Sequence, residues 1–229
     1  MIKKAMILAA GFGKRLNPLT LKYPKPLLQI GNETLLSNTI KFLEEFGIKK
    51  IVINVHYLGD QIKEYIDKKK FNLDITIIDE HEKILDTGGG VLNALNHINE
   101  TFLCINPDTI WNSNYIKELK KMENDFFLKK RKCSLLLVNK TKSFDKNLKG
   151  DFNLANGMII RNKNEEQKYI YTGLQIINPE VFVNMNDKIF SINTIWDQLI
   201  KDQNLFGSES LIDFIHVSTL EIYKKLNIK

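Results

Sequence analysis

The sequence is poor in cysteine and has no long apolar run. Cys104 and Cys133 are its only cysteines, and each stands within an apolar segment. Such residues are typical of buried, reduced thiols rather than of a disulfide framework or a zinc site. No apolar run approaches the roughly 18 residues that cross a membrane, and the run at 5–10 is too short for a secretory signal. We therefore expect a soluble cytoplasmic protein without a membrane partner.

The charge is not extreme in either sign. Lys and Arg number 33 against 27 Asp and Glu, which gives a net charge of +6. This excess favours anionic partners and by itself leaves phosphate ligands and nucleic acid open. The most basic run, at 129–132, is typical of a solvated helix end, so we expect no nucleic-acid partner. With 43% hydrophobic residues among 229, the chain can bury a core without help from a metal or disulfide.

Internal repeats, long linkers and low-complexity segments are also absent, and strand-like runs alternate with helix-like patterns instead. Apolar strands are predicted at 5–10, 51–55, 73–78, 102–105 and 133–138, and helices at 34–46, 58–69, 91–98 and 115–122. Continuous apolar strands separated by helices indicate an α/β protein with a Rossmann-like, mostly parallel sheet covered on both faces.

The pattern changes near residue 140. Shorter runs follow at 158–160, 169–170 and 173–177, then a helical stretch at 194–200, a strand at 212–217 and a closing helix at 219–226. These runs predict a smaller β-rich part added to the sheet. We expect a single domain over 1–229, with a first half at 1–140 and a second at 141–229.

A glycine-rich motif, Leu-Ala-Ala-Gly-Phe-Gly-Lys-Arg-Leu-Asn-Pro-Leu-Thr, occupies residues 8–20. Gly11 and Gly13 follow the first strand and allow a sharp turn, so that backbone N–H groups can approach a phosphate. A P-loop is excluded because Arg15 stands where it needs Ser or Thr, and the dinucleotide fingerprint is excluded because Leu16 replaces its third glycine. The motif predicts a polyphosphate cradle of another kind.

A second motif, Pro-Lys-Pro-Leu, lies at 24–27. Its two prolines stiffen the backbone around Lys25, which indicates that this lysine has a fixed target. Together with Lys14 and Arg15, it supplies positive charge for a bound polyphosphate.

Both motifs resemble the N-terminal pattern of the sugar-1-phosphate nucleotidyltransferases. The segments at 86–90, 106–109 and 150–152 (Asp-Thr-Gly-Gly-Gly, Asn-Pro-Asp-Thr and Gly-Asp-Phe) are most similar to the short branch that uridylylates N-acetylmuramate 1-phosphate in cell-wall recycling. The resemblance implies a GT-A-like fold with a nucleotide-binding half at 1–140 and a sugar-binding half with a C-terminal helix at 141–229.

The resemblance also implies a reaction, in which a nucleoside triphosphate (UTP preferred) and a sugar 1-phosphate give a nucleotide sugar and pyrophosphate. It assigns Arg15 to the departing pyrophosphate, Lys25 to the phosphates that meet, and Gly88 to the base and ribose. The remaining residues that it places on the nucleotide phosphates are Ala10, Gly11, Phe12, Gly13 and Lys14.

The implied cofactor is Mg²⁺, held by Asp108 at the end of the strand 102–105. Asn106 and Asp151 would face the sugar. The family usually has a second metal carboxylate near the C-terminus, where this chain has His216. Either His216 binds the metal as a neutral imidazole or a water replaces the missing ligand.

Several alternatives stay open on the sequence alone. They are guanylyl transfer to mannose 1-phosphate, uridylyl or thymidylyl transfer to glucose 1-phosphate, and a non-catalytic nucleotide-binding protein. Three intact residues, Arg15, Lys25 and Asp108, favour an enzyme. Nothing in the sequence indicates the oligomeric state.

Overall fold

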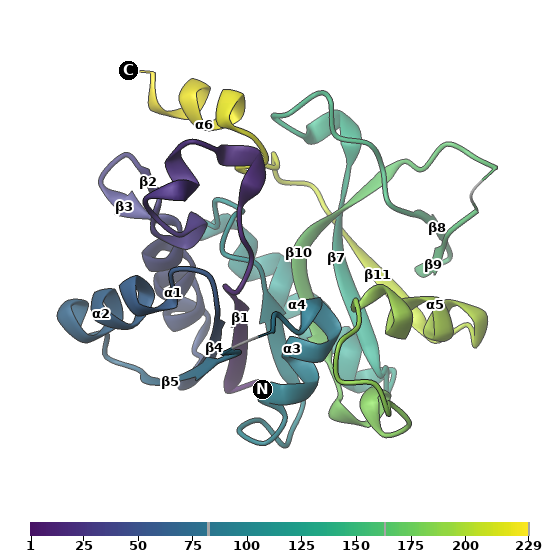
Figure 1. Ribbon diagram of the computed structural model, residues 1–229. Coiled ribbons are helices and arrows are strands. Elements are labelled where there is room, and N and C mark those ends of the chain that lie inside the picture. Colours follow the sequence, from purple (N-terminus) through teal and green to yellow (C-terminus); the bar gives the residue numbers. More distant parts are fainter. Residues whose placement is uncertain (82, 163, 229) are drawn as a thin grey trace.

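The computed structural model describes residues 1–81, 83–162 and 164–228 (Figure 1). The strands are β1 (Lys4–Leu8), β2 (Gln29–Ile30), β3 (Glu33–Thr34), β4 (Lys50–Val55), β5 (Asp74–Asp79), β6 (Phe102–Ile105), β7 (Cys133–Asn139), β8 (Asn153–Ala155), β9 (Met158–Ile160), β10 (Tyr169–Ile177) and β11 (Leu205–Ser210). The helices are α1 (Leu35–Phe46), α2 (Gly59–Lys69), α3 (Asp86–Ala94), α4 (Asn114–Leu128), α5 (Asn193–Lys201) and α6 (Leu220–Asn227).

Within the described residues, nine strands form one mixed sheet in the order β5-β4-β1-β6-β10-β7-β11-β9-β8. Strands β5, β4, β1 and β6 run parallel, while β10 lies antiparallel between β6 and β7. The predicted α/β class with a mostly parallel sheet is confirmed. One sheet runs through both predicted halves of the chain, and their functional division at residue 140 stays a prediction.

The core lies on both faces of this sheet because apolar residues follow one another along its strands. In β1, Ala5 and Ile7 pack on the face covered by α1, α2 and α4, whereas Met6 packs on the face covered by α3 and α5. Successive side chains of a strand point to opposite faces, so a continuous apolar strand fills both cores. Full burial of one such side chain stabilises the fold by about 1.5–3 kcal/mol. Cys104 and Cys133 are buried free thiols in this core, as predicted.

Helix α1 has clear signals at both ends. The Thr34 hydroxyl accepts a hydrogen bond from the Ser37 N–H at 3.0 Å, and Gly47 ends the helix in a left-handed conformation with φ +105°. These are the ordinary start and stop signals of a helix, and they confirm the prediction over 34–46. No helix in the described part of the chain is long and apolar enough to span a membrane.

The predicted helix at 91–98 is wrong in its start. Helix α3 begins at Asp86 and contains the whole glycine triplet 88–90. Gly88 and Gly89 donate their N–H groups to the Phe190 carbonyl at 2.9 and 3.0 Å, a close approach that side chains at these positions would block. Tertiary packing therefore outweighs the low helix propensity of glycine here.

The predicted strand at 212–217 is also wrong. This segment makes only isolated bridges, Thr109 with His216 and Ser143 with Phe214, within the described residues. The strand that completes the sheet is β11, which pairs in parallel with β7. Its sequence, Leu-Phe-Gly-Ser-Glu-Ser, has few apolar residues and therefore gives a weak strand signal.

Candidate active site

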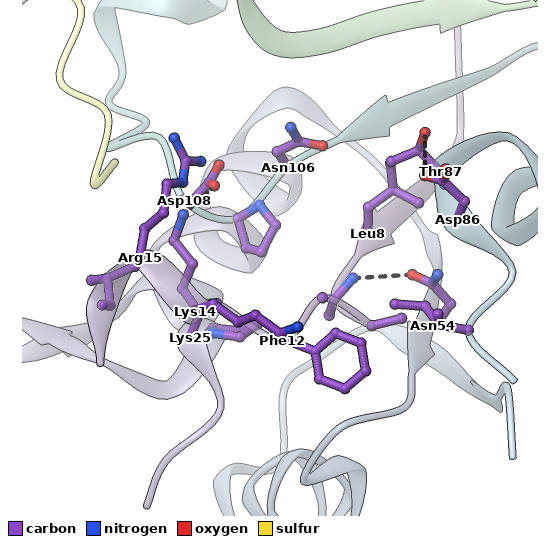
Figure 2. Close-up of a pocket in the computed structure, with 18 residues that line it drawn as sticks. Leu8, Phe12, Lys14, Arg15, Lys25, Asn54, Asp86, Thr87, Asn106 and Asp108 are labelled. Atoms are coloured by element: carbon purple, nitrogen blue, oxygen red, sulfur yellow. Dashed lines mark hydrogen bonds and ion pairs between the residues drawn. The ribbon is translucent and has the colours of Figure 1, made fainter. Parts of the chain in front are cut away.

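A pocket of about 430 Å³ opens at the carboxyl ends of the parallel strands β1, β4 and β6, where ligands gather in sheets of this kind (Figure 2). The lining residues are 8–16, Lys25, Pro26, Asn54, Ile84, Asp86, Thr87 and 106–108. The pocket therefore brings together both N-terminal motifs with the start of α3 and the end of β6.

The glycine-rich loop turns at Gly13, whose φ is +64°. A side chain there would place its Cβ 2.9 Å from Thr20 Cγ2 and 3.1 Å from Lys25 Cβ. The Thr20 hydroxyl donates to the Gly13 carbonyl at 3.0 Å, which holds the turn closed. Gly13 thus sets Lys25 against the glycine loop, and the predicted turn has a specific packing reason.

Aromatic and cationic side chains lie on and beside the same loop. The Phe12 ring lies 5.7 Å from the His56 ring and 5.4 Å from the Tyr57 ring, measured between centroids. Lys14 Nζ lies 5.2 Å from the centroid of the Phe12 ring. Figure 2 shows the Arg15 side chain on the same side of the pocket as Asp108. Cationic side chains therefore line the pocket, and their contact with a polyphosphate stays a prediction.

Lys25 and Asp108 form the central ion pair of the site. Lys25 Nζ donates to Asp108 Oδ2 at 2.5 Å, and His216 Nε2 lies 3.1 Å from the same oxygen. All three side chains are largely buried. Burial raises the pKa of the Asp108 carboxyl, but the positive charge of Lys25 and the contact with His216 outweigh it and hold that pKa well below its usual range. Asp108 is therefore an anion at neutral pH.

Backbone hydrogen bonds hold His216 beside Asp108. The Val217 N–H donates to the Asp108 carbonyl at 2.8 Å, and the Ile110 N–H donates to the Ile215 carbonyl at 2.9 Å. This pairing brings residues more than 100 positions apart in the sequence into one cluster. His216 does not appear among the residues that line the pocket described above.

The two residues predicted to face the sugar flank one irregular stretch of β10. Its register shifts between Tyr171 and Gln175, and Gly173 there has φ +91° and accepts the Asn106 N–H at 2.7 Å. Asp151 Oδ2 accepts the Tyr171 N–H at 2.9 Å. Although solvent reaches Asp151, the protein around it partly dehydrates the carboxyl and raises its pKa.

Gly88 lies outside the pocket lining of the described residues. Its N–H already donates to Phe190, and an added Cβ would lie 2.4 Å from Phe190 Cε2. The structure thus gives Gly88 a packing role, and its predicted place beneath the base and ribose stays a prediction. Thr87, one residue earlier, does line the pocket.

The chain is similar to known proteins in sequence and in fold. A family model described as nucleotidyl transferase matches residues 4–143. The chain belongs to the nucleotidyl transferase family. The matched region holds the glycine loop, Lys25 and Asp108, whereas Asp151 and His216 lie beyond it.

The curated relatives of this nucleotidyl transferase carry out more than one transfer. An N-acetylmuramate alpha-1-phosphate uridylyltransferase of Caulobacter vibrioides is 29% identical over 90% of this chain and 87% of its own length. Its counterpart in Neisseria meningitidis is 31% identical over 78% and 77%. A mannose-1-phosphate guanylyltransferase catalytic subunit beta of Dictyostelium discoideum is 28% identical over 89% of this chain and 57% of its own length. The expected class, a sugar-1-phosphate nucleotidyltransferase, is confirmed, but its base and sugar are not fixed.

Solved structures agree on the fold. The UDP-glucose pyrophosphorylase of Acinetobacter baumanii has a TM-score of 0.80 at 15% identity, covering 99% of this chain and 92% of that one. The inositol-1-phosphate CTP transferase of T. maritima has a TM-score of 0.78 at 14% identity, with coverages of 98% and 96%. The GT-A-like fold predicted for this nucleotidyl transferase is confirmed.

The donor set is compatible with one divalent cation bound together with a substrate. The described residues hold no group of three or more His, Cys, Asp or Glu side chains placed to bind a metal ion. Asp108 supplies a carboxylate, and its neighbour His216 supplies an imidazole nitrogen 3.1 Å away. Because Mg²⁺ commonly binds through one or two carboxylates plus phosphate oxygens and water, this set fits the predicted ion.

Sequence reasoning missed two buried polar residues: Asn54, which lines the pocket, and Glu80, which is hydrogen-bonded to Asn54. Asn54 accepts the Ala9 N–H at 3.0 Å, which a dashed line beside Asn54 marks in Figure 2, and it donates to Glu80 Oε1 at 2.6 Å. A signal for Asn54 was present, since it interrupts the apolar run Ile-Val-Ile-Asn-Val at 51–55. A polar residue inside a buried strand needs a hydrogen-bond partner and is therefore a candidate for a specific role.

Proposed function

We propose that this nucleotidyl transferase transfers UMP from UTP to N-acetylmuramate 1-phosphate, giving a UDP-sugar and pyrophosphate in peptidoglycan recycling. The observation that carries the proposal is the placement of three segments that resemble the muramate branch. Residues 86–87 and 106–108 line the pocket, and Asp151 lies beside the stretch of β10 that contacts Asn106. The similarity to the Caulobacter vibrioides uridylyltransferase over 90% of the chain supports the same choice.

The reaction needs positioned charge more than proton transfer. An oxygen of the sugar phosphate forms a bond to the α-phosphorus, and the bond from that phosphorus to the pyrophosphate oxygen breaks. The attacking oxygen is already an anion at neutral pH, so no general base is required. Catalysis then depends on alignment and on neutralisation of the phosphate charges.

The cationic side of the pocket matches this demand. The backbone from Ala10 to Gly13, with Lys14, is proposed to hold the triphosphate, and Arg15 to hold the departing pyrophosphate. Lys25, buried beside Asp108, is proposed to neutralise the α-phosphate and the sugar phosphate as they meet. A buried lysine acts in a medium of low dielectric constant, where its charge is worth more than in water.

The acidic residues of the site and Asn106 are proposed to hold the metal and the sugar. A bound Mg²⁺ supplies further neutralisation of the phosphate oxygens, and Asp108 is the residue that would hold it, with His216 beside it. Asn106 and Asp151 are proposed to contact the sugar hydroxyl or acetamido groups. The Asp151 carboxylate is already oriented by the Tyr171 N–H.

A pyrophosphate-release screen tests the proposal directly. The four common triphosphates are combined with N-acetylmuramate 1-phosphate, N-acetylglucosamine 1-phosphate, mannose 1-phosphate and glucose 1-phosphate, with Mg²⁺ present. We expect the fastest release with UTP and N-acetylmuramate 1-phosphate. Turnover only with GTP and mannose 1-phosphate would support the guanylyl alternative, which the Dictyostelium discoideum relative favours.

The same screen separates an enzyme from a non-catalytic nucleotide-binding protein. Binding of a triphosphate without pyrophosphate release for any sugar phosphate would contradict the proposal. The intact Lys25–Asp108 ion pair favours turnover, because a protein that only binds a nucleotide does not need a buried charge pair at the reacting end.

A further inference from the structure

Asn54 and Glu80 form a buried bridge between the two walls of the pocket. Asn54 lies at the carboxyl end of β4 and lines the pocket, and Glu80 follows β5. Asn54 is 3% exposed and Glu80 is 7% exposed. Burial of a carboxylate is costly unless its oxygens accept hydrogen bonds, so the contacts of this pair are expected to be specific.

Each polar group of the bridge has a defined partner. Asn54 Oδ1 accepts the N–H of Ala9, the residue that opens the glycine loop, at 3.0 Å. Asn54 Nδ2 donates to Glu80 Oε1 at 2.6 Å. Glu80 Oε2 accepts the N–H of Leu85, directly before α3, at 2.8 Å. Three hydrogen bonds therefore connect the start of the glycine loop to the start of α3.

The third glycine of the triplet makes room for this bridge. A Cβ on Gly90 would lie 2.7 Å from Asn54 Nδ2 and 2.9 Å from Glu80 Oε1. Real Cβ atoms do not approach polar atoms so closely, and a side chain here would push the pair apart. Gly90 does not line the pocket, and the space that the bridge needs explains why a glycine stands at this position.

We propose that Asn54 and Glu80 are positioning residues that fix the distance between the triphosphate wall and the opposite wall of the nucleotide site. The inference rests on the proposed function, since it assumes that a nucleoside triphosphate occupies this pocket. The glycine loop is the wall proposed to contact the phosphates. Ile84, Asp86 and Thr87 also line the pocket, and Figure 2 shows Asp86 and Thr87 across it from Phe12 and Lys14. A rigid connection keeps both walls at the spacing of one nucleotide. The protein therefore loses less conformational entropy when the nucleotide binds.

An exchange of the two side-chain types tests the bridge. In E80Q, one amide oxygen cannot serve both the Asn54 amide and the Leu85 N–H, so one donor stays unpaired. In N54D, two carboxylates face each other. In the double variant N54D/E80Q, Asp accepts from Ala9 and from the new glutamine amide, and the glutamine oxygen accepts from Leu85, so all three hydrogen bonds are restored with the same net charge.

Calorimetry with Mg²⁺ present measures the dissociation constant of each variant for UTP, and for GTP as a second probe. The melting temperature of each variant is measured as well. We expect at least a fivefold weaker nucleotide affinity in each single variant and an affinity within threefold of wild type in the double variant. A purely structural role predicts lower melting temperatures with unchanged affinity, and that result overturns the proposal. So does a double variant that regains stability without regaining affinity.

Gly90→Ala provides an independent test if a single variant fails to fold. This substitution inserts a methyl group against the bridge without changing any donor or acceptor. We expect it to weaken nucleotide binding at least threefold, and unchanged affinity overturns the proposal. If wild-type protein binds neither UTP nor GTP, the proposed function itself fails, which distinguishes that failure from a failure of the bridge.

Discussion

At the scale of single residues, the site centres on one carboxylate that has two nitrogen partners. Asp108 Oδ2 lies 2.5 Å from Lys25 Nζ and 3.1 Å from His216 Nε2. The Pro-Lys-Pro motif alone indicated a fixed target for Lys25, whereas Asp108 and His216 were proposed through a family resemblance, because these residues are far apart in the chain. Sequence reasoning missed Asn54, although this polar residue interrupts the apolar run at 51–55, and it found no signal for Glu80, because the hydrogen bonds between these residues form only in the folded chain.

Lys25→Ala is expected to lower kcat/KM by 100-fold or more, about 3 kcal/mol, because this variant loses the buried charge that we propose to neutralise the transferring phosphate. Steady-state pyrophosphate release measures it. Lys22→Ala is the matched control, since Lys22 is an exposed lysine of the same segment. Near-normal turnover of a folded Lys25→Ala protein would remove this residue from the mechanism.

Asp108→Asn is expected to abolish metal-dependent turnover. His216→Ala is expected to lower turnover less than Asp108→Asn does, and His216→Asp is expected to preserve or raise the affinity for Mg²⁺. The reason is that hard cations prefer carboxylate to imidazole. Titration of activity with Mg²⁺ and Mn²⁺ compares the three variants. If His216→Ala were as inactive as Asp108→Asn, Asp108 would not be sufficient, and His216 would be an essential ligand of the metal.

Both cysteines are expected to resist thiol reagents in the native protein at pH 8. Burial raises the pKa of Cys104 to about 12 and also raises that of Cys133, so the reactive thiolate is scarce and shielded. Ellman's reagent should label no thiol in the folded protein and two after denaturation. Rapid labelling of the native chain would contradict the buried placement.

At the scale of elements, hydrophobic pattern predicted most strands and helices, and the exceptions have physical causes. Helix α1 was predicted correctly because Thr34 and Gly47 mark its ends. Helix α3 was predicted to start too late because glycine is a poor helix former, and only the contact with Phe190 explains why Gly88 is helical. Strand β11 was missed because its stability comes from pairing with β7 rather than from apolar residues.

Gly88→Ala is expected to destabilise the protein by about 2 kcal/mol, because the clash with the Phe190 ring at 2.4 Å outweighs a gain of about 1 kcal/mol in helix propensity. Thermal unfolding should show a midpoint about 5 °C lower. Gly11→Ala is the stability control, since its Cβ would meet nothing within 4 Å. An unchanged midpoint for Gly88→Ala would contradict the packing role.

At the scale of the whole molecule, one sheet carries the pocket and the residues proposed to bind the sugar. The alternation of strands and helices was enough to predict the α/β class and the mostly parallel sheet. The base and the sugar could not be predicted from residues alone, because relatives with this fold act on different bases and sugars. Such choices depend on a few atoms in the pocket wall rather than on the pattern that sets the fold.

The most direct test of the central claim is ³¹P NMR of the protein with UTP, N-acetylmuramate 1-phosphate and Mg²⁺. We expect the sugar phosphate resonance to decrease while a sugar-linked diphosphate and pyrophosphate form in equal amounts. The same mixture with Lys25→Ala should change at least 100 times more slowly. Release of orthophosphate, or an unchanged spectrum with this and every other pairing of triphosphate and sugar 1-phosphate, would contradict the claim that this pocket carries out nucleotidyl transfer.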